Sequence, residues 1–174
     1  GTSLLSQLLS LDPMVRAPLQ WETRSPVPPS TLAGAADDPR IAECATGLDM
    51  LAKINPAIQA MHPFGAMLAE ECVPFLMLDL RTLGMETQGY VPTYGQWLQS
   101  CDMTTAYEQH RKALQALQVG QPTEHWTLKT PNHLWALETL LAFYPDARLI
   151  WTHRDPGPVV TSVASLNTTM QRAF

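Results

Sequence analysis

The chain has 174 residues, 45% of them hydrophobic, which is enough to bury the core of one ordinary domain. Its net charge of −5 argues against a nucleic-acid-binding protein, and its apolar runs fall well short of the ~20 residues that span a membrane. Cys44, Cys72 and Cys101 lie far apart and no signal peptide is recognisable, which favours a reducing, cytoplasmic location without disulfides or a cysteine zinc site.

The opening segment, G-T-S-L-L-S-Q-L-L-S-L, predicts a glycine turn and a helix that Asp12 and Pro13 end. Backbone N–H groups at a helix start attract anions, and the hydroxyls of Thr2 and Ser3 add donors; a plain helix cap is the alternative. Since a strand precedes such a turn in a parallel sheet, we expect the first strand to lie upstream of Gly1 and to be missing.

Residues 16–39 are rich in proline and predict an irregular loop that leaves this helix. The loop contains Trp21 and Glu22. A carboxylate at the mouth of an anion site can act as a general base, which makes Glu22 a candidate; a surface glutamate is the alternative.

The middle of the chain predicts a helical insertion, residues 38–120. Helices are expected over 38–61, over 67–83 with a bend at Pro74, from about 93, and over 104–118. The pair Glu70-Glu71 faces either a cavity or solvent, and solvent is the favoured interpretation. Aromatic residues of this region and the preceding loop line either an acceptor pocket or the core; they are Trp21, Tyr90, Tyr94 and Trp97.

The last part, residues 121–174, predicts strand, helix, strand and helix, with the strands over 126–129 and 147–152 and the helices over 133–143 and from 159. Lys129 ends the first strand, where parallel sheets present their ligand crevice; a solvated lysine is the alternative. His133, four residues later, is a second candidate base, or else a capping or core histidine.

Arg154 follows the second predicted strand, and Ser162 comes eight residues later, beyond a Pro-Gly-Pro turn. A guanidinium and a hydroxyl together suit a phosphate, so we expect the two to converge on one anion; a surface pair of Arg154 with Asp155 is the alternative. His153 is placed to contact the same anion or to pack.

These elements predict an α/β fold: one partial domain with a P-loop-like parallel sheet core, incomplete at its first strand, and a largely helical insertion. Residues 1–37 form the anion loop, its helix and the proline-rich loop, and residues 121–174 hold the second anion site. A Walker A loop would need lysine where Thr2 stands, which weakens a kinase-like interpretation.

The motifs G-T-S-L-L, L-D-P-M-V-R, W-E, L-K-T-P-N-H and W-T-H-R-D-P, in this order, resemble sulfotransferases that use 3′-phosphoadenosine-5′-phosphosulfate (PAPS). The resemblance is to the bacterial group distantly related to tyrosylprotein sulfotransferases. It implies PAPS as the co-substrate, a hydroxyl-bearing or small-molecule acceptor, and no metal. It also places a basic residue upstream of Gly1, so this chain alone is expected to be inactive.

The resemblance assigns roles to the candidate residues. Gly1, Thr2 and Ser3 would bind the 5′-phosphosulfate, and Arg154 with Ser162 the 3′-phosphate. Lys129 would stabilise the leaving oxygen, and Glu22 would be the base, a role that a histidine takes in other sulfotransferases and that keeps His133 as an alternative. A nucleotide-binding kinase-like protein and a non-catalytic PAPS-binding domain are the competing interpretations; the oligomeric state is not readable from the sequence.

Overall fold

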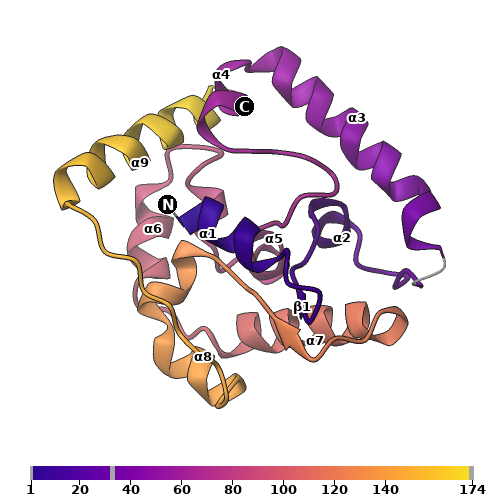
Figure 1. The fold of residues 1–174 in the computed structure, drawn as a ribbon. Helices are drawn as coiled ribbons and strands as arrows, with labels where there is room; N and C mark the ends of the chain where they lie inside the picture. Colours follow the sequence, from indigo (N-terminus) through magenta and orange to yellow (C-terminus); the bar gives the residue numbers. More distant parts are fainter. Residues whose placement is uncertain (1, 32–33, 173–174) are drawn as a thin grey trace.

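The computed structural model describes residues 2–31 and 34–172, which fold into helices around a small parallel sheet (Figure 1). The helices are α1 (Thr2–Leu9), α2 (Gln20–Arg24), α3 (Pro39–Ile54), α4 (Ala57–Met61), α5 (Val73–Met77), α6 (Pro92–Leu98), α7 (Thr104–Gly120), α8 (Leu137–Phe143) and α9 (Pro156–Gln171). The strands are β1 (Val15–Arg16) and β2 (His125–Trp126), and the 3-10 turns are η1 (Ala35–Asp37), η2 (Leu83–Met85) and η3 (Pro131–Trp135).

Helix α7 forms the centre of the packing. Its buried residues recur every three or four positions, so they share one face; they are Ala106, Tyr107, His110, Ala113, Leu114 and Leu117. That face packs against α5 and α8, where Phe75, Leu76 and Leu140 are buried. Helix α3 packs separately against α2, around Trp21 and Leu48.

Two of the long helices, α3 and α9, begin where the sequence supplies a cap. Asp38 accepts a hydrogen bond from the Arg40 backbone N–H at 3.0 Å, and Pro39 occupies the first turn of α3. Asp155 accepts from the Gly157 N–H at 2.9 Å and opens α9 in the same way. Helix α9 therefore starts at residue 156, three residues earlier than expected.

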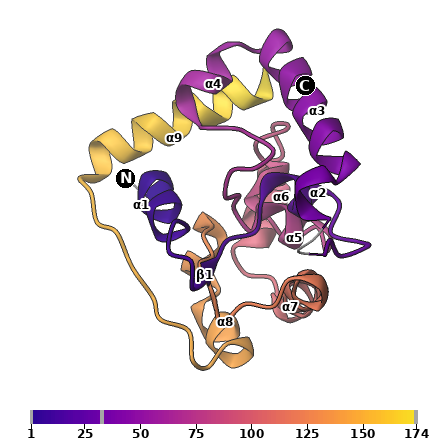
Figure 2. The same cartoon turned by 45° about the vertical axis from the view of Figure 1, so that its right-hand side comes forward.

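The sheet joins two segments that lie far apart in sequence. Strand β1 pairs in parallel with β2, Val15 opposite His125 and Arg16 opposite Trp126. The pairing brings the segment after β2, which leads to Lys129, close to the segment after α1 (Figure 2). This arrangement agrees with the predicted α/β class, which has a parallel sheet and a helical insertion.

The expected buried strand over residues 147–152 does not form. Among the described residues this segment has no strand partner, and its apolar side chains face outward, with Ile150 66% and Trp151 60% exposed. A strand needs a neighbouring backbone for its hydrogen bonds, and hydrophobic sequence alone does not supply one. The segment is instead part of an extended connection from α8 to α9.

Two predicted helices differ from the structure because of local breaks. The helix over 67–83 shrinks to α5, since Pro74 lies in its first turn and the ring prevents the helix from passing through that position. The helix over 133–143 divides at Ala136 into η3 and α8. Within the proline-rich loop, the stretch between Pro18 and Pro26 forms α2, which the prediction left irregular.

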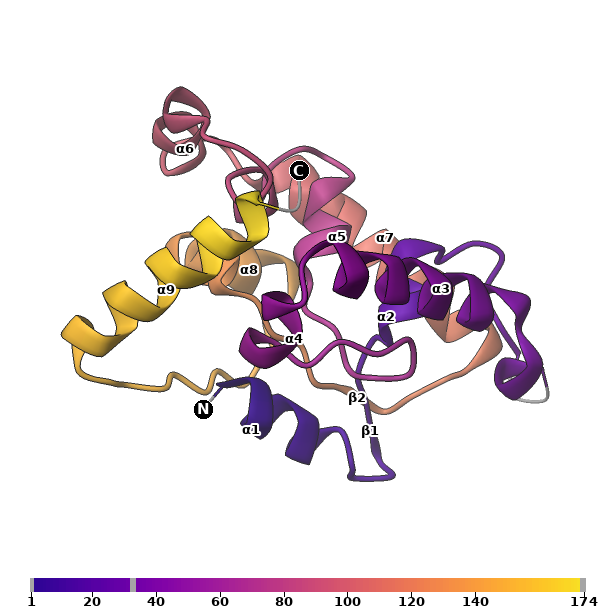
Figure 3. The same ribbon diagram turned by 90° about the horizontal axis from the view of Figure 1, so that it is seen from above.

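The last helix, α9, packs against the middle of the chain. Helix α9 packs on α4, and the Asn55 side chain donates a hydrogen bond to the Thr169 carbonyl. In all three views the start of α1 lies on the same side of the molecule as the extended connection from α8 to α9 (Figures 1, 2 and 3). None of the helices in the ranges 2–31 and 34–172 is long and apolar enough to cross a membrane.

Candidate functional site

A lysine and a serine 126 positions apart meet at the start of α1. The Lys129 ammonium lies 3.2 Å from the Ser3 hydroxyl oxygen and 2.5 Å from the Glu71 carboxylate. Both charged side chains are mostly buried, 18% and 19% exposed. Because α1 carries no acidic residue in its first turn, the helix start and the lysine together form a positively polarised surface that suits an anion.

Glu71 has two cationic neighbours. The His62 imidazole lies 3.6 Å from the oxygen that accepts from Lys129. Burial opposes ionisation of Glu71, but these two neighbours outweigh it and lower its pKa, and the facing carboxylate raises the pKa of His62. Burial raises the pKa of the adjacent Glu70.

The expectation that Glu70 and Glu71 form a solvated helical face is therefore wrong. Both residues lie in an extended segment before α5, and both are half-buried. Neither the ion pair with Lys129 nor the contact with His62 has a signature in local sequence, because the partners stand 58 and nine positions away. The order of charges along the chain gave no sign of this cluster.

Glu22 is almost fully buried, with 1% exposure, and its carboxylate is held from two sides. One oxygen accepts from the Arg16 guanidinium at 2.5 Å and the other from the Leu19 N–H at 3.0 Å, which caps α2. Each carboxylate oxygen has a second lone pair, so the group can still accept a proton from a ligand hydroxyl. Glu22 is therefore fixed in position and not a mobile surface side chain.

Arg16 is a positioning residue that the sequence analysis did not single out. Its guanidinium donates to the carbonyls of Leu117 and Gln121, at 2.9 and 2.7 Å, besides the bond to Glu22. It also lies over the Trp126 ring, 4.9 Å from the centroid. The arginine thus ties helix α2, which carries Glu22, to the end of α7 and to β2.

A cavity of about 550 Å³ lies between α1, β1 and the loop over residues 67–69, and Glu22 is part of its wall. Its other lining residues are mainly apolar and include Leu4, Leu8 and Met67. Ligand sites have about this volume and combine apolar walls with a few polar groups. A small molecule with an apolar body and a hydroxyl fits this description.

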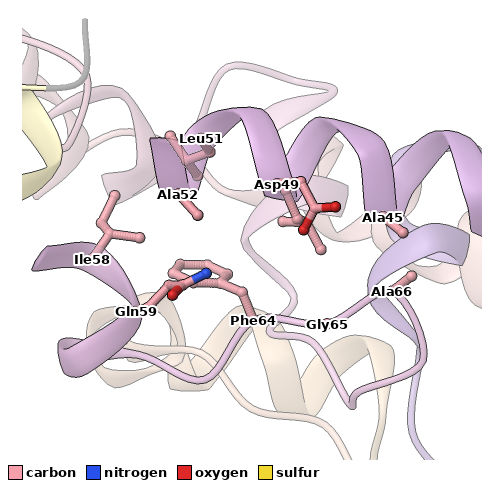
Figure 4. A pocket seen from close by; sticks show the side chains of 10 residues that line it. Ala45, Asp49, Leu51, Ala52, Ile58, Gln59, Phe64, Gly65 and Ala66 are labelled. Carbon is pink, nitrogen blue, oxygen red and sulfur yellow. The ribbon is translucent and has the colours of Figure 1, made fainter. Parts of the chain in front are cut away.

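A smaller cavity of about 120 Å³ lies between α3, α4 and the segment around Phe64 (Figure 4). Its walls include Ile58 and Ala66, with the polar ends of Asp49 and Gln59 at its rim. None of the predicted site residues lines it, and its volume is below the ~300 Å³ of typical ligand pockets. It is therefore a packing gap at the α3–α4 junction.

The His133 ring packs against residues of the core. Its Nδ1 atom lies 2.7 Å from the Tyr107 hydroxyl, and its ring packs edge-on against His110, 6.0 Å between centroids. Burial lowers the pKa of His133 to about 4. The core-histidine alternative describes this geometry.

Arg154 and Ser162 are both exposed. Arg154 lies in the extended connection, not at the end of a strand as expected, and Ser162 lies on α9 as expected. Among residues 2–31 and 34–172, no hydrogen bond or ion pair engages the Arg154 guanidinium, so the surface pair with Asp155 that was the alternative is not formed. His153 stacks on Trp151, with 5.7 Å between ring centroids.

The remaining anion-loop residues lie at the first turn of α1. Thr2 is exposed, and Ser3 makes the contact with Lys129 described above. Gly1 lies outside the described residues. The aromatic candidates divide: Trp21 is buried in the core against α3, whereas Tyr90 is 87% exposed.

Three comparisons with known proteins bear on this site. The family model described as "Sulfotransferase family" matches residues 1–174. The fold is similar to sulfotransferase STF1 from Mycobacterium tuberculosis H37Rv, with a TM-score of 0.87 and 30% identity, covering 100% of this chain and 48% of that chain. It is also similar to sulfotransferase STF9 from Mycobacterium avium, with a TM-score of 0.82 and 34% identity, covering 98% and 44%. This chain thus spans less than half the length of either; no curated protein matches significantly.

Proposed function

Because the chain belongs to the sulfotransferase family, we propose that it binds PAPS and takes part in transfer of the sulfuryl group to a hydroxyl-bearing acceptor. The observation that carries the proposal is the 3.2 Å contact between the Lys129 ammonium and the Ser3 hydroxyl. It brings together the G-T-S and L-K-T-P-N-H motifs, whose contacting residues stand 126 positions apart in the chain. A cytoplasmic location is part of the same proposal.

In this scheme the chain binds its donor through two groups of residues. The first turn of α1, with Thr2 and Ser3, takes the 5′-phosphosulfate, since its backbone N–H groups and hydroxyls are donors. Gly1, which precedes α1 in the sequence, is assigned to the same role by its motif. Arg154 and Ser162 take the 3′-phosphate, and the exposed, unpaired guanidinium supports this role. The bound donor supplies the activated sulfuryl group, which the acceptor oxygen attacks in line with the departing phosphate oxygen.

The residues around the reacting atoms move one proton and stabilise one developing charge. Glu22 accepts the proton of the acceptor hydroxyl, since its buried carboxylate lines the cavity of about 550 Å³. Lys129 stabilises the negative charge that grows on the leaving oxygen. For this the Lys129 ammonium must leave the Glu71 carboxylate and contact the bound donor instead. Ser3, which is assigned to the same donor, already lies 3.2 Å from the ammonium.

The experiment measures binding and turnover separately. Binding of the desulfonated nucleotide (PAP) is followed by calorimetry. Turnover is followed by PAP release from PAPS in the presence of phenolic and aliphatic alcohols, in a protein that carries the basic residue expected upstream of Gly1. Glu22→Gln is expected to leave PAP affinity within about twofold and to lower turnover ~10²-fold or more, the loss typical of a general base. His133→Gln is the comparison for the alternative base, and we expect it to lose much less turnover than Glu22→Gln.

Three outcomes distinguish the alternatives. Normal turnover in Glu22→Gln together with loss in His133→Gln would transfer the base role to His133. PAP binding without turnover, with the upstream basic residue present, would identify a non-catalytic PAPS-binding domain. Absence of PAP binding would refute the proposal.

A further inference from the structure

Three potential metal ligands from separate segments of the chain converge in the core, next to the segment that carries Lys129. Cys72 immediately precedes α5, His110 lies on α7 and His133 on η3, and one ligand atom from each lies within 4.8 Å of the other two. Cys72 and His110 are fully buried, with 0% exposure. The sequence analysis excluded a cysteine zinc site because it looked for paired cysteines, and this set has one thiol and two imidazoles.

Both imidazoles are oriented by outer partners. The Tyr144 hydroxyl lies 2.7 Å from Nδ1 of His110, and the Tyr107 hydroxyl lies 2.7 Å from Nδ1 of His133. Metal-binding histidines almost always use one ring nitrogen for such a contact, which fixes the ring and leaves the other nitrogen for the ion. Nε2 is therefore the ligating atom that each ring has available here.

One of these nitrogens has no partner in the protein. Nε2 of His110 is buried and has no hydrogen bond among the described residues. An unsatisfied buried polar atom destabilises the fold unless something binds it.

The spacing suits an ion of moderate size. Three atoms within 4.8 Å of one another enclose a point no more than about 2.8 Å from each, against the ~2.0–2.3 Å of zinc–nitrogen and zinc–sulfur bonds. Contraction by about 0.5–0.8 Å per side chain completes the coordination, a shift that small rotations about χ1 and χ2 provide. A tetrahedral ion would have one position left for water.

From this geometry we propose that Cys72, His110 and His133 form a binding site for a borderline-soft divalent transition-metal ion, with Zn²⁺ as the expected occupant. A thiolate with two imidazoles is a donor set that suits zinc. On binding, the ion replaces the Cys72 thiol proton, which leaves to solvent, and forms one metal–sulfur and two metal–nitrogen bonds. No change of oxidation state is involved.

The site would act on the neighbouring functional residues through the backbone. The Cys72 N–H donates to the Lys129 carbonyl at 2.9 Å, so an ion bound to Cys72 stiffens the segment that carries the lysine. It also takes Nε2 of His133, which is incompatible with His133 acting as a base. The inference does not depend on the proposed sulfuryl transfer, because it rests on core residues alone.

Cobalt(II) titration of the protein, purified without metal, tests the site. We expect one equivalent of Co²⁺ to produce a thiolate-to-cobalt charge-transfer band, and Zn²⁺ to displace it. Cys72→Ser should abolish the band and weaken Zn²⁺ binding at least tenfold in competition with a chromophoric chelator. Cys44→Ser is the matched control, since Cys44 is also buried but lies in the separate core around Trp21.

Tyr144→Phe tests the same site without touching a ligand. Loss of its hydroxyl frees Nδ1 of His110 and should weaken Zn²⁺ binding about tenfold or more, the range seen for outer partners of metal-bound histidines. This variant decides the matter if Cys72→Ser does not fold. Absence of the band in the wild type, or a band that survives Cys72→Ser or Tyr144→Phe with unchanged affinity, would overturn the proposal.

Discussion

Replacement of Glu71 by glutamine tests the electrostatics around Lys129. The carboxylate lies 2.5 Å from the Lys129 ammonium and 3.6 Å from His62, in side chains that are 18–21% exposed. A pair of unit charges at such a separation interacts by ~1–4 kcal/mol between bulk water and a protein surface. Glutamine retains an oxygen acceptor and partial exposure screens the pair, so we expect a loss of about 1–2 kcal/mol in unfolding free energy.

The loss should depend on pH in a defined direction. The folded pKa of Glu71 is lowered, so its contribution is present above its ordinary value of 4.5 and disappears as the pH falls through the folded pKa. The folded pKa of His62 is raised, so its contribution is present below its ordinary value of 6.5 and disappears as the pH rises through the folded pKa. The difference between wild type and Glu71→Gln is therefore greatest between pH 4.5 and 6.5.

Urea denaturation at pH 3, 5.5 and 8 measures this difference, with Glu138→Gln on the exposed side of α8 as the control. At pH 5.5 the melting temperature should also fall, by ~2–4 °C for each kcal/mol in a chain of this size. At pH 3 the difference should be smaller than at pH 5.5, because protonation of Glu71 removes part of its contribution. A difference that stays constant across this range would refute the assignment of charge to the Glu71 cluster.

The remaining predictions address the second anion site and two glycines. Arg154→Ala should weaken PAP binding at least tenfold in calorimetry, because the guanidinium is exposed and unengaged, whereas Arg148→Ala, also exposed, should not. Gly47→Ala should raise the unfolding free energy by ~0.5–1 kcal/mol, since an added Cβ in the middle of α3 meets nothing within 4 Å. Gly120→Ala should lower it by ~1–3 kcal/mol, since the Cβ would come 2.0 Å from the Ser30 carbonyl oxygen; equal melting temperatures for the two glycine variants would contradict this packing.

Local sequence signals determined several elements correctly. The apolar spacing of residues 104–117 places one face of α7 in the core, and α3 begins close to Pro39, where a helix was expected from residue 38. Residue order also indicated the family, because short motifs at fixed spacing, such as G-T-S and L-K-T-P-N-H, are read without knowledge of the fold. All of these depend on interactions within a few residues of the chain.

Only the tertiary structure decided which residues contact one another when they lie far apart in the sequence. Glu71 was expected in solvent and pairs with Lys129; His133 was a candidate base and faces Tyr107; the segment 147–152 was expected as a strand and has no backbone beside it. A charge, an imidazole or a strand takes its state from the atoms that surround it. Those atoms come from distant segments, so local periodicity and propensity carry no information about them.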